Sequence, residues 1–186
     1  MPLIPLIPLI NQHSKRKMMS IHPTSEQLAL LKKLTSGQDH LTGENLLYCT
    51  WASALNSQST FVVEQVSALI EKPNTEQKRA ISLAISRMGV TNPYFISRQL
   101  VRVMAGGTLN DLGFSSLSAL NVENEIAYHY ACIVISLMNG GQPCLNSHIH
   151  SLRAAGETEQ AIDAAMRLAA ICSSLAKSQF ALSIDI

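Results

Sequence analysis

A cysteine and a histidine four residues apart carry the clearest chemistry in this chain. Cys144 follows residues 139–143, Asn-Gly-Gly-Gln-Pro, which break an apolar segment and favour a new helix, because proline is well tolerated in a first helical turn. The unpaired N–H groups and the dipole at a helix start favour the thiolate, the reactive form of cysteine. His148 lies one turn further on the same face, where it can accept the thiol proton or, as a cation, hold the thiolate. The pair is interpreted as an activated nucleophile.

The same spacing also has a purely structural interpretation. Free cysteine is among the most buried residue types, and a Cys/His pair at this spacing often arises by chance. The spacing alone therefore leaves both interpretations open.

Composition excludes several classes of protein. With 186 residues and 47% hydrophobic residues the chain can form a core, and a net charge of +1 offers no broad basic field for nucleic acid. Its cysteines, at positions 49, 132, 144 and 172, form neither a zinc pattern nor a disulfide framework, so we expect no metal, no cofactor and a reducing, cytoplasmic location. No uninterrupted apolar run reaches the roughly 18 residues of a membrane span, so no membrane association is expected.

The first 19 residues do not fit the domain that follows. Residues 1–10 contain Pro-Leu-Ile three times, and the basic residues come after this apolar stretch, unlike a secretory signal. We predict a disordered leader or non-native start over 1–19 and a single domain over 20–186.

Helical periodicity and capping signals predict an all-α protein. The expected helices cover 24–33, 43–55, 60–70, 73–88, 94–104, 123–138, 144–155 and 158–180, with Gly89 ending the fourth. Residues 108–121 are polar and rich in Gly and Ser, which predicts a loop with short helical turns. Thr-Glu-Gln opens a helix at both 75–77 and 158–160, which suggests duplicated halves over about 40–105 and 120–181.

Residues 139–153 resemble the signature of the alkylhydroperoxidase D proteins, in the carboxymuconolactone decarboxylase superfamily. Residues 88–95, Met-Gly-Val-Thr-Asn-Pro-Tyr-Phe, followed by Arg98, are similar to the family's Met-Gly-x-x-Asn segment, and 161–181 resembles its last helix. The likeness covers most of 25–181. It implies a duplicated all-helical bundle that assembles as a homo-oligomer, either a trimer or a hexamer built as a dimer of trimers.

The resemblance also implies roles for individual residues. Cys144 matches the family's peroxide-attacking cysteine, and His148 matches its relay histidine. Gly141 stands in the place of the resolving cysteine, His129 in that of the relay glutamate, and Pro143 in that of a second histidine. Parts of the family's relay have therefore changed identity.

Loss of the resolving cysteine changes the expected cycle. A thiolate that attacks a peroxide becomes a sulfenic acid, which another thiol must clear. Cys132 is the only plausible internal candidate, but it is expected to point into the core. We therefore expect a one-cysteine cycle that uses a hydroperoxide substrate and an external thiol reductant.

Other residues near the motif have more than one interpretation or are expected to play a secondary part. His129 is either a second proton carrier or a hydrogen-bonded core residue, and Glu125, one turn earlier, is an alternative carboxylate. Ser147 is a candidate hydrogen-bond donor, whereas His150 is expected to face elsewhere.

The sequence thus favours a thiol-dependent peroxidase, an antioxidant oxidoreductase with Cys144, His148, His129 and Ser147 in its catalytic site. The alternatives are a carboxymuconolactone decarboxylase-like enzyme acting on a small lactone acid, and an inactive oligomeric scaffold.

Overall fold

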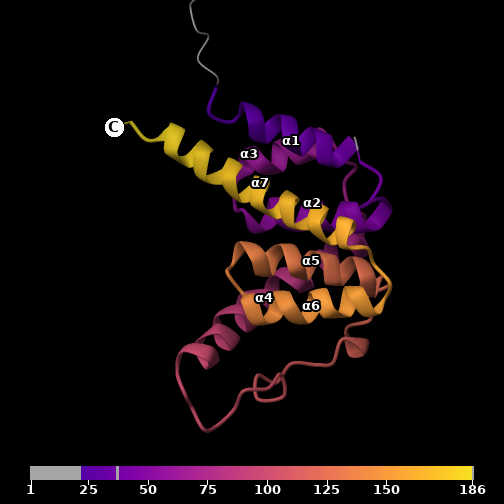
Figure 1. The fold of residues 1–186 in the computed structure, drawn as a ribbon, viewed down its shortest axis with the longest axis vertical. Helices are drawn as coiled ribbons and strands as arrows, with labels where there is room; N and C mark the ends of the chain where they lie inside the picture. The colour runs from indigo at the N-terminus through magenta and orange to yellow at the C-terminus, as the bar shows by residue number, and fades with distance from the viewer. Residues whose placement is uncertain (1–21, 37, 186) are drawn as a thin grey trace, which may run out of the picture.

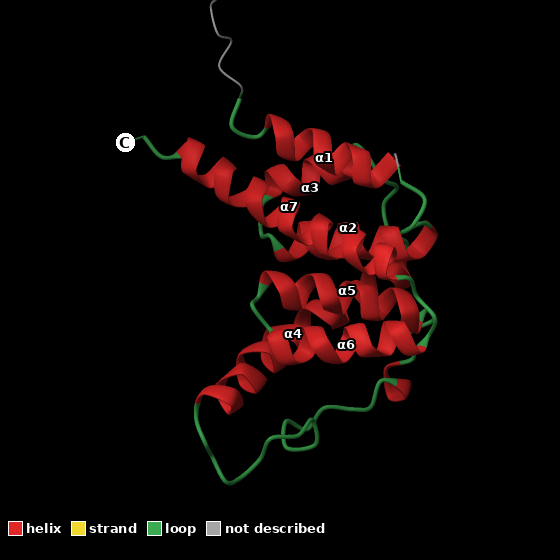
Figure 2. Cartoon of the chain, viewed as in Figure 1, coloured by secondary structure: helices red, strands yellow, loops and turns green. Residues whose placement is uncertain are grey.

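The computed structural model describes residues 22–36 and 38–185, and throughout this part of the chain the regular elements are helical (Figures 1 and 2). The predicted leader over 1–19 lies outside the described residues. The helices are α1 (Ser25–Ser36), α2 (Gly43–Asn56), α3 (Thr60–Ser67), α4 (Thr75–Leu100), the short 3-10 helix η1 (Ser118–Leu120), α5 (Glu125–Met138), α6 (Gln142–Ala154) and α7 (Glu159–Ser183). The predicted all-α class is confirmed.

Helix α5 forms the centre of the bundle. It packs against α2, α4, α6 and α7, and all residues from Tyr130 to Ser136 are buried. A helix that is apolar on every side is stable only when other helices surround it. In Figure 1 α5 accordingly lies between α2 on one side and α4 and α6 on the other. This position makes α5 the element against which the site helices α4 and α6 are aligned.

The sequence prediction was wrong about the stretch from 73 to 104. Two helices were expected, separated near Gly89 and Pro93, but α4 runs without a break to Leu100 with Pro93 inside it. Proline removes one hydrogen bond from a helix and crowds the carbonyl four residues earlier, but packing against α5 and α6 supports the turns on both sides. The continuous helix carries Asn92 into the interior, where it is fully buried.

The remaining helix ends follow their local signals. Asn74 and Gln77 form a reciprocal capping box at the start of α4, with two hydrogen bonds of 2.9 Å. Thr158 caps α7 through the Ala161 N–H at 3.2 Å. Gly156, with φ of +85°, ends the α6 region as expected, because glycine tolerates this left-handed conformation.

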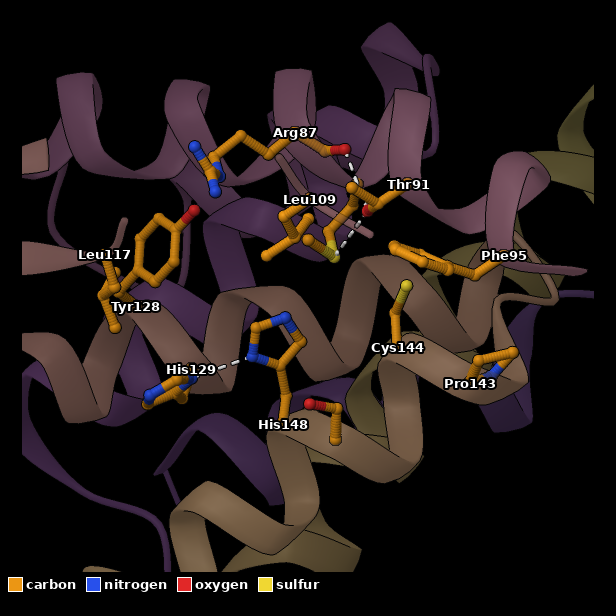
Figure 3. Close-up of a pocket in the computed structure, with 12 residues that line it drawn as sticks. Arg87, Thr91, Phe95, Leu109, Leu117, Tyr128, His129, Pro143, Cys144 and His148 are labelled. Atoms are coloured by element: carbon orange, nitrogen blue, oxygen red, sulfur yellow. Dashed lines mark hydrogen bonds between the residues drawn. The ribbon is translucent and has the colours of Figure 1, made fainter. Parts of the chain in front are cut away.

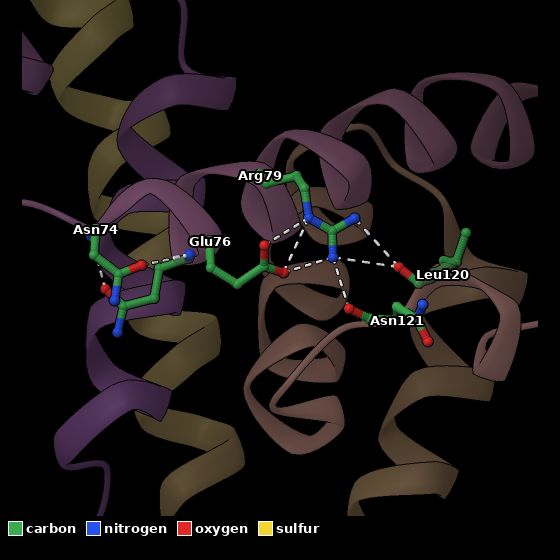
Figure 4. Close-up of polar contacts among 6 residues, drawn as sticks. Asn74, Glu76, Arg79, Leu120 and Asn121 are labelled. Atoms are coloured by element: carbon green, nitrogen blue, oxygen red, sulfur yellow. Dashed lines mark hydrogen bonds and ion pairs between the residues drawn. The ribbon is translucent and has the colours of Figure 1, made fainter.

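Residues 108–121 lie in a loop with a short helical turn, as predicted, but the connection already begins at Val101 instead of after Met104 and runs to Asn124, and α4 holds it at both ends. At its start the Arg98 guanidinium donates to the Val103 and Ala105 carbonyls at 2.7 and 2.9 Å. At its end Arg79 is paired with Glu76 and donates to the Leu120 and Asn121 carbonyls (Figure 4). The loop is therefore fixed against the face of α4 that carries the site.

The two predicted halves contain helices in a similar order. Each has a helix of 14 residues, α2 or α5, then a shorter helix, then a long one of 26 or 25 residues, α4 or α7. The duplication itself stays a prediction.

Apolar side chains are exposed where α4 ends. Leu100 is 79% exposed and Met104 82% exposed, and Val101 and Val103 lie beside them. Clusters of exposed apolar residues are typical of surfaces that another protein covers. Over the described residues, no helix combines the length and the apolar character needed to cross a membrane. Because the resemblance implies a homo-oligomer, we expect a second copy of the chain to cover the exposed apolar side chains at the end of α4.

A charged residue in this segment is expected to weaken self-association. Leu100→Asp combined with Met104→Asp should lower the mass measured by size-exclusion chromatography with light scattering, because burying a carboxylate in an apolar interface is costly. Ser82→Asp adds one carboxylate at an exposed position earlier on α4 and should leave the mass unchanged. A wild-type protein that is already monomeric would contradict the expectation.

Candidate functional site

Three helices and the long loop enclose a cavity of about 350 Å³ (Figure 3). Its lining residues come from α4 (Arg87, Met88, Thr91, Phe95), the loop (Leu109, Leu117), α5 (Tyr128, His129) and α6 (Pro143, Cys144, Ser147, His148). The cavity thus brings together all four predicted site residues, from two helices. The loop, predicted only as a connection, supplies part of the wall.

Cys144 sits in the first turn of α6, as its sequence context predicts. The helix begins at Gln142, and its first backbone bond runs from the Leu145 N–H to the Gly141 carbonyl at 2.9 Å. The Cys144 amide thus belongs to the first-turn donors that have no acceptor within the helix. The residue is 7% exposed, and its sulfur points into the cavity beneath Phe95 (Figure 3). This environment is water-poor yet open to a small ligand.

His148 and His129 form a hydrogen-bonded pair. Their Nδ1 atoms are 2.8 Å apart, and the ring centroids are 5.1 Å apart (Figure 3). Only one of two facing Nδ1 atoms can carry the shared proton, so one ring donates and the other accepts. His129, for which a core role was the alternative, therefore lies in the site and touches the motif histidine directly.

The surroundings keep these histidines uncharged. Burial, aided by the neighbouring His129 and the positive charge of Arg87, lowers the pKa of His148 from 6.5 to about 4. Burial also lowers the pKa of His129, although the Glu125 carboxylate partly opposes this. At neutral pH His148 is therefore a proton acceptor. Burial disfavours the alternative role, in which His148 is already a cation in the resting protein and holds the thiolate.

The hydrogen bonds of the described residues do not join Cys144 to either histidine. Cys144 and His148 share the cavity wall, one helical turn apart on α6. Proton transfer between them therefore needs a modest side-chain rotation or the substrate itself as a bridge, as is common for sites without ligand.

Gly141 has no room for a larger side chain. A β-carbon there would lie 2.8 Å from the Asn92 Cβ and closer still to the Asn92 amide. Asn92 is held in this place by a 3.0 Å bond to the Ser136 hydroxyl and a 3.2 Å bond from the Asn139 amide. The position that matches the family's resolving cysteine is thus closed by a satisfied, fully buried asparagine.

The other candidate residues lie at the exposed edge of the cavity or outside it. Ser147 lines the cavity but is exposed, and His150 is exposed outside the cavity, as expected. Glu125 does not line the cavity, so it is no direct substitute for the family's glutamate. Cys132 is fully buried, and loss of hydration raises the pKa of its thiol far above the ordinary range. It is poorly suited to act as a resolving thiolate.

Several lining residues were not foreseen. Arg87 and Tyr128 bring polar groups into the cavity, and Met88, Thr91 and Phe95 form its apolar wall. Tyr128 lies next to His129 in sequence, but its position on an apolar helix does not indicate a role in the site. Arg87 precedes the Met-Gly segment by one residue, but nothing in its spacing links it to residues 40 or more positions later.

One protein family and several known proteins are similar to this chain. The model of the carboxymuconolactone decarboxylase family matches residues 127–184. An alkyl hydroperoxide reductase AhpD from Caulobacter vibrioides is 29% identical over 131 residues, which cover 68% of this chain and 69% of the relative. Proteins of the same name from Mycolicibacterium paratuberculosis and Frankia alni are 28% and 27% identical, over 74% and 76% of this chain and 78% and 77% of their own lengths.

The low pKa of His148 predicts how stability depends on pH. The unfolded chain takes up a proton on this side chain as the pH falls through about 6.5, whereas the folded protein does so only near 4. The free energy of unfolding should therefore drop by about 1 to 3 kcal/mol between these pH values. Urea unfolding of His148→Gln should show a flatter pH dependence, while His150→Gln, on the same helix, should keep the wild-type slope. Equal slopes for all three proteins would contradict the burial of a neutral His148.

The contact at Gly141 predicts a steric penalty. Gly141→Ala should lower the free energy of unfolding by about 1 to 3 kcal/mol, because the Asn92 side chain must move and lose its bonds. Gly89→Ala, where a β-carbon meets nothing within 4 Å, should be neutral or stabilising by up to about 1 kcal/mol. Denaturant unfolding of the two variants measures the difference. A Gly141→Ala protein as stable as wild type would show that the contact is not restrictive.

Proposed function

We propose that this chain, which is similar to the alkyl hydroperoxide reductase AhpD proteins and matches the carboxymuconolactone decarboxylase family over residues 127–184, is a thiol-dependent peroxidase in which Cys144 reduces hydroperoxides. The observation that carries the proposal is the position of Cys144. Its thiol opens into the cavity at the start of α6, on the same wall as a neutral His148.

The first step transfers one oxygen atom to sulfur. His148 accepts the thiol proton, and the Cys144 thiolate attacks the terminal oxygen of the hydroperoxide. The O–O bond breaks, sulfur becomes a sulfenic acid, and the alkoxide leaves as an alcohol with the proton from His148. Cysteine is oxidised by two electrons and the hydroperoxide is reduced by two.

His129 extends the proton path. When Nε2 of His148 accepts a proton, the proton shared between the two Nδ1 atoms can move toward His129. The charge is then spread over two rings instead of one, which offsets part of the cost of burying it. Ser147, exposed at the cavity rim, is proposed as a hydrogen-bond donor to the incoming peroxide.

The second half of the cycle uses an external thiol. That thiol attacks the sulfenic acid, releases water and leaves a mixed disulfide, which a second thiol reduces to regenerate Cys144. The closed position at Gly141 and the buried, weakly acidic Cys132 support this route over an internal disulfide.

A second candidate function is the conversion of a small lactone acid. Arg87 favours it, because a cation in the cavity wall can bind the carboxylate of such a substrate. That chemistry does not require a thiol, so its dependence on Cys144 distinguishes the two functions.

The test is consumption of cumene hydroperoxide and hydrogen peroxide with dithiothreitol as reductant. Cys144→Ser should reduce the rate to that of the uncatalysed reaction, and His148→Gln should lower it by about 10² or more, since the proton acceptor is lost. Trapping with a sulfenic-acid reagent and mass spectrometry should label Cys144 alone.

Two variants serve as controls for this assay. Cys172→Ser changes a buried cysteine outside the cavity and should keep the wild-type rate, provided that circular dichroism shows the fold intact. Cys132→Ser should also remain active if no internal disulfide forms. Absence of both turnover and sulfenic acid in wild type would reject the peroxidase, and turnover of a lactone acid by Cys144→Ser would favour the second candidate.

A further inference from the structure

Two polar groups of the cavity have no part in the peroxide chemistry. Arg87 and Tyr128 both line it, on α4 and α5, at the side away from Cys144 (Figure 3). In that view the Tyr128 hydroxyl points toward the Arg87 guanidinium, and His148 lies between this corner and Cys144. The cavity thus has the Cys144 thiol at one side and the polar groups of Arg87 and Tyr128 at the other.

Arg87 is positioned by the loop but is not neutralised. One of its guanidinium nitrogens donates to the Ser115 carbonyl at 3.0 Å, and its guanidinium carbon lies 4.8 Å from the centre of the Phe114 ring. None of the ion pairs among the described residues includes it. A guanidinium has five N–H donors in a planar fork, so several remain for an anion.

Tyr128 is a buried hydroxyl without a partner. The residue is 2% exposed, and its oxygen makes no hydrogen bond within the described structure. A buried hydroxyl in this condition costs folding free energy, and such groups in native proteins call for a ligand or another explanation. Burial and the neighbouring Cys132 thiol raise the pKa of the Tyr128 hydroxyl, whereas the nearby charge of Arg87 partly lowers it.

We propose that Arg87 and Tyr128 bind the carboxylate of the substrate, so that the preferred hydroperoxides are those of small organic acids with an apolar body. The inference rests on the proposed peroxidase function. An arginine and a phenol hydroxyl can each donate to one carboxylate, and Leu109, Leu117 and Phe95 supply apolar walls for the rest of the molecule. Such binding would direct the hydroperoxide end toward Cys144.

The test compares two hydroperoxides that differ in charge and by a single methyl group. Cumene hydroperoxide bearing a para carboxylate is the probe, and its methyl ester is the neutral control. For wild type, kcat/KM should be about tenfold or more higher for the carboxylate, because a charge-assisted hydrogen bond is lost with the ester. Equal values for the two compounds would overturn the inference while leaving the peroxidase proposal intact.

A substitution tests whether Arg87 causes the preference for the carboxylated hydroperoxide. Arg87→Met should bring the ratio of the two kcat/KM values close to one, mainly through KM. Arg167→Met removes an exposed arginine on α7 outside the cavity and should keep the wild-type ratio. A preference that survives Arg87→Met would exclude Arg87 as the carboxylate partner.

Tyr128→Phe tests whether the Tyr128 hydroxyl binds the substrate or stabilises the fold. It should lower the ratio by about threefold to tenfold, while the melting temperature stays the same or rises, because an unpaired buried hydroxyl is removed. A lower melting temperature with an unchanged ratio would show that the hydroxyl has a structural role instead.

A binding measurement keeps this inference separate from peroxidase activity. The alcohol product of the carboxylated probe should bind to Cys144→Ser in calorimetry, and the added Arg87→Met change should weaken it about tenfold or more. Binding of this kind, combined with no peroxide turnover by the wild type, would support carboxylate binding at Arg87 and Tyr128 and reject the peroxidase. If the alcohol product does not bind to Cys144→Ser, the proposal that Arg87 and Tyr128 bind a carboxylate is overturned.

Discussion

The packing of Asn92 against Gly141 is the contact on which the site depends. Asn92 reaches from α4 into the turn between α5 and α6, where only a residue without a side chain leaves room for it. Its hydrogen bonds with Ser136 and Asn139 tie it to the end of α5. Because α6 begins at this turn, the same contact fixes where Cys144 lies relative to α4. One buried amide thus aligns three helices around the cavity.

Electrostatics in the cavity follow from burial and from one unneutralised cation. Loss of hydration keeps His148 and His129 neutral, and the charge of Arg87 works in the same direction on His148. A thiol proton therefore has an uncharged acceptor beside it, and the cavity keeps a positive corner for an anionic group. The two histidines share one proton between their Nδ1 atoms. When His148 accepts a further proton, the shared proton can move toward His129.

The positions at which this chain departs from the pattern of the family it resembles are physically consistent with one another. Where the family has a second cysteine, Gly141 leaves space that a hydrogen-bonded asparagine fills, and the site keeps one accessible thiol. Where it has a glutamate, His129 provides a ring that bonds directly to His148. A buried carboxylate at that position would raise the pKa of His148, whereas a neutral imidazole allows it to stay low.

The sequence by itself determined the helical class, most helix ends and the place of Cys144 in the first turn of a helix, because these depend on periodicity, caps and turn residues only a few positions apart. It did not determine that α4 continues through Pro93, since packing against α5 and α6 outweighs the local cost of a proline. Tertiary structure alone decided that Arg87 and Tyr128 share a cavity with Cys144. Contacts between distant segments depend on how whole helices pack, and no short-range pattern encodes that.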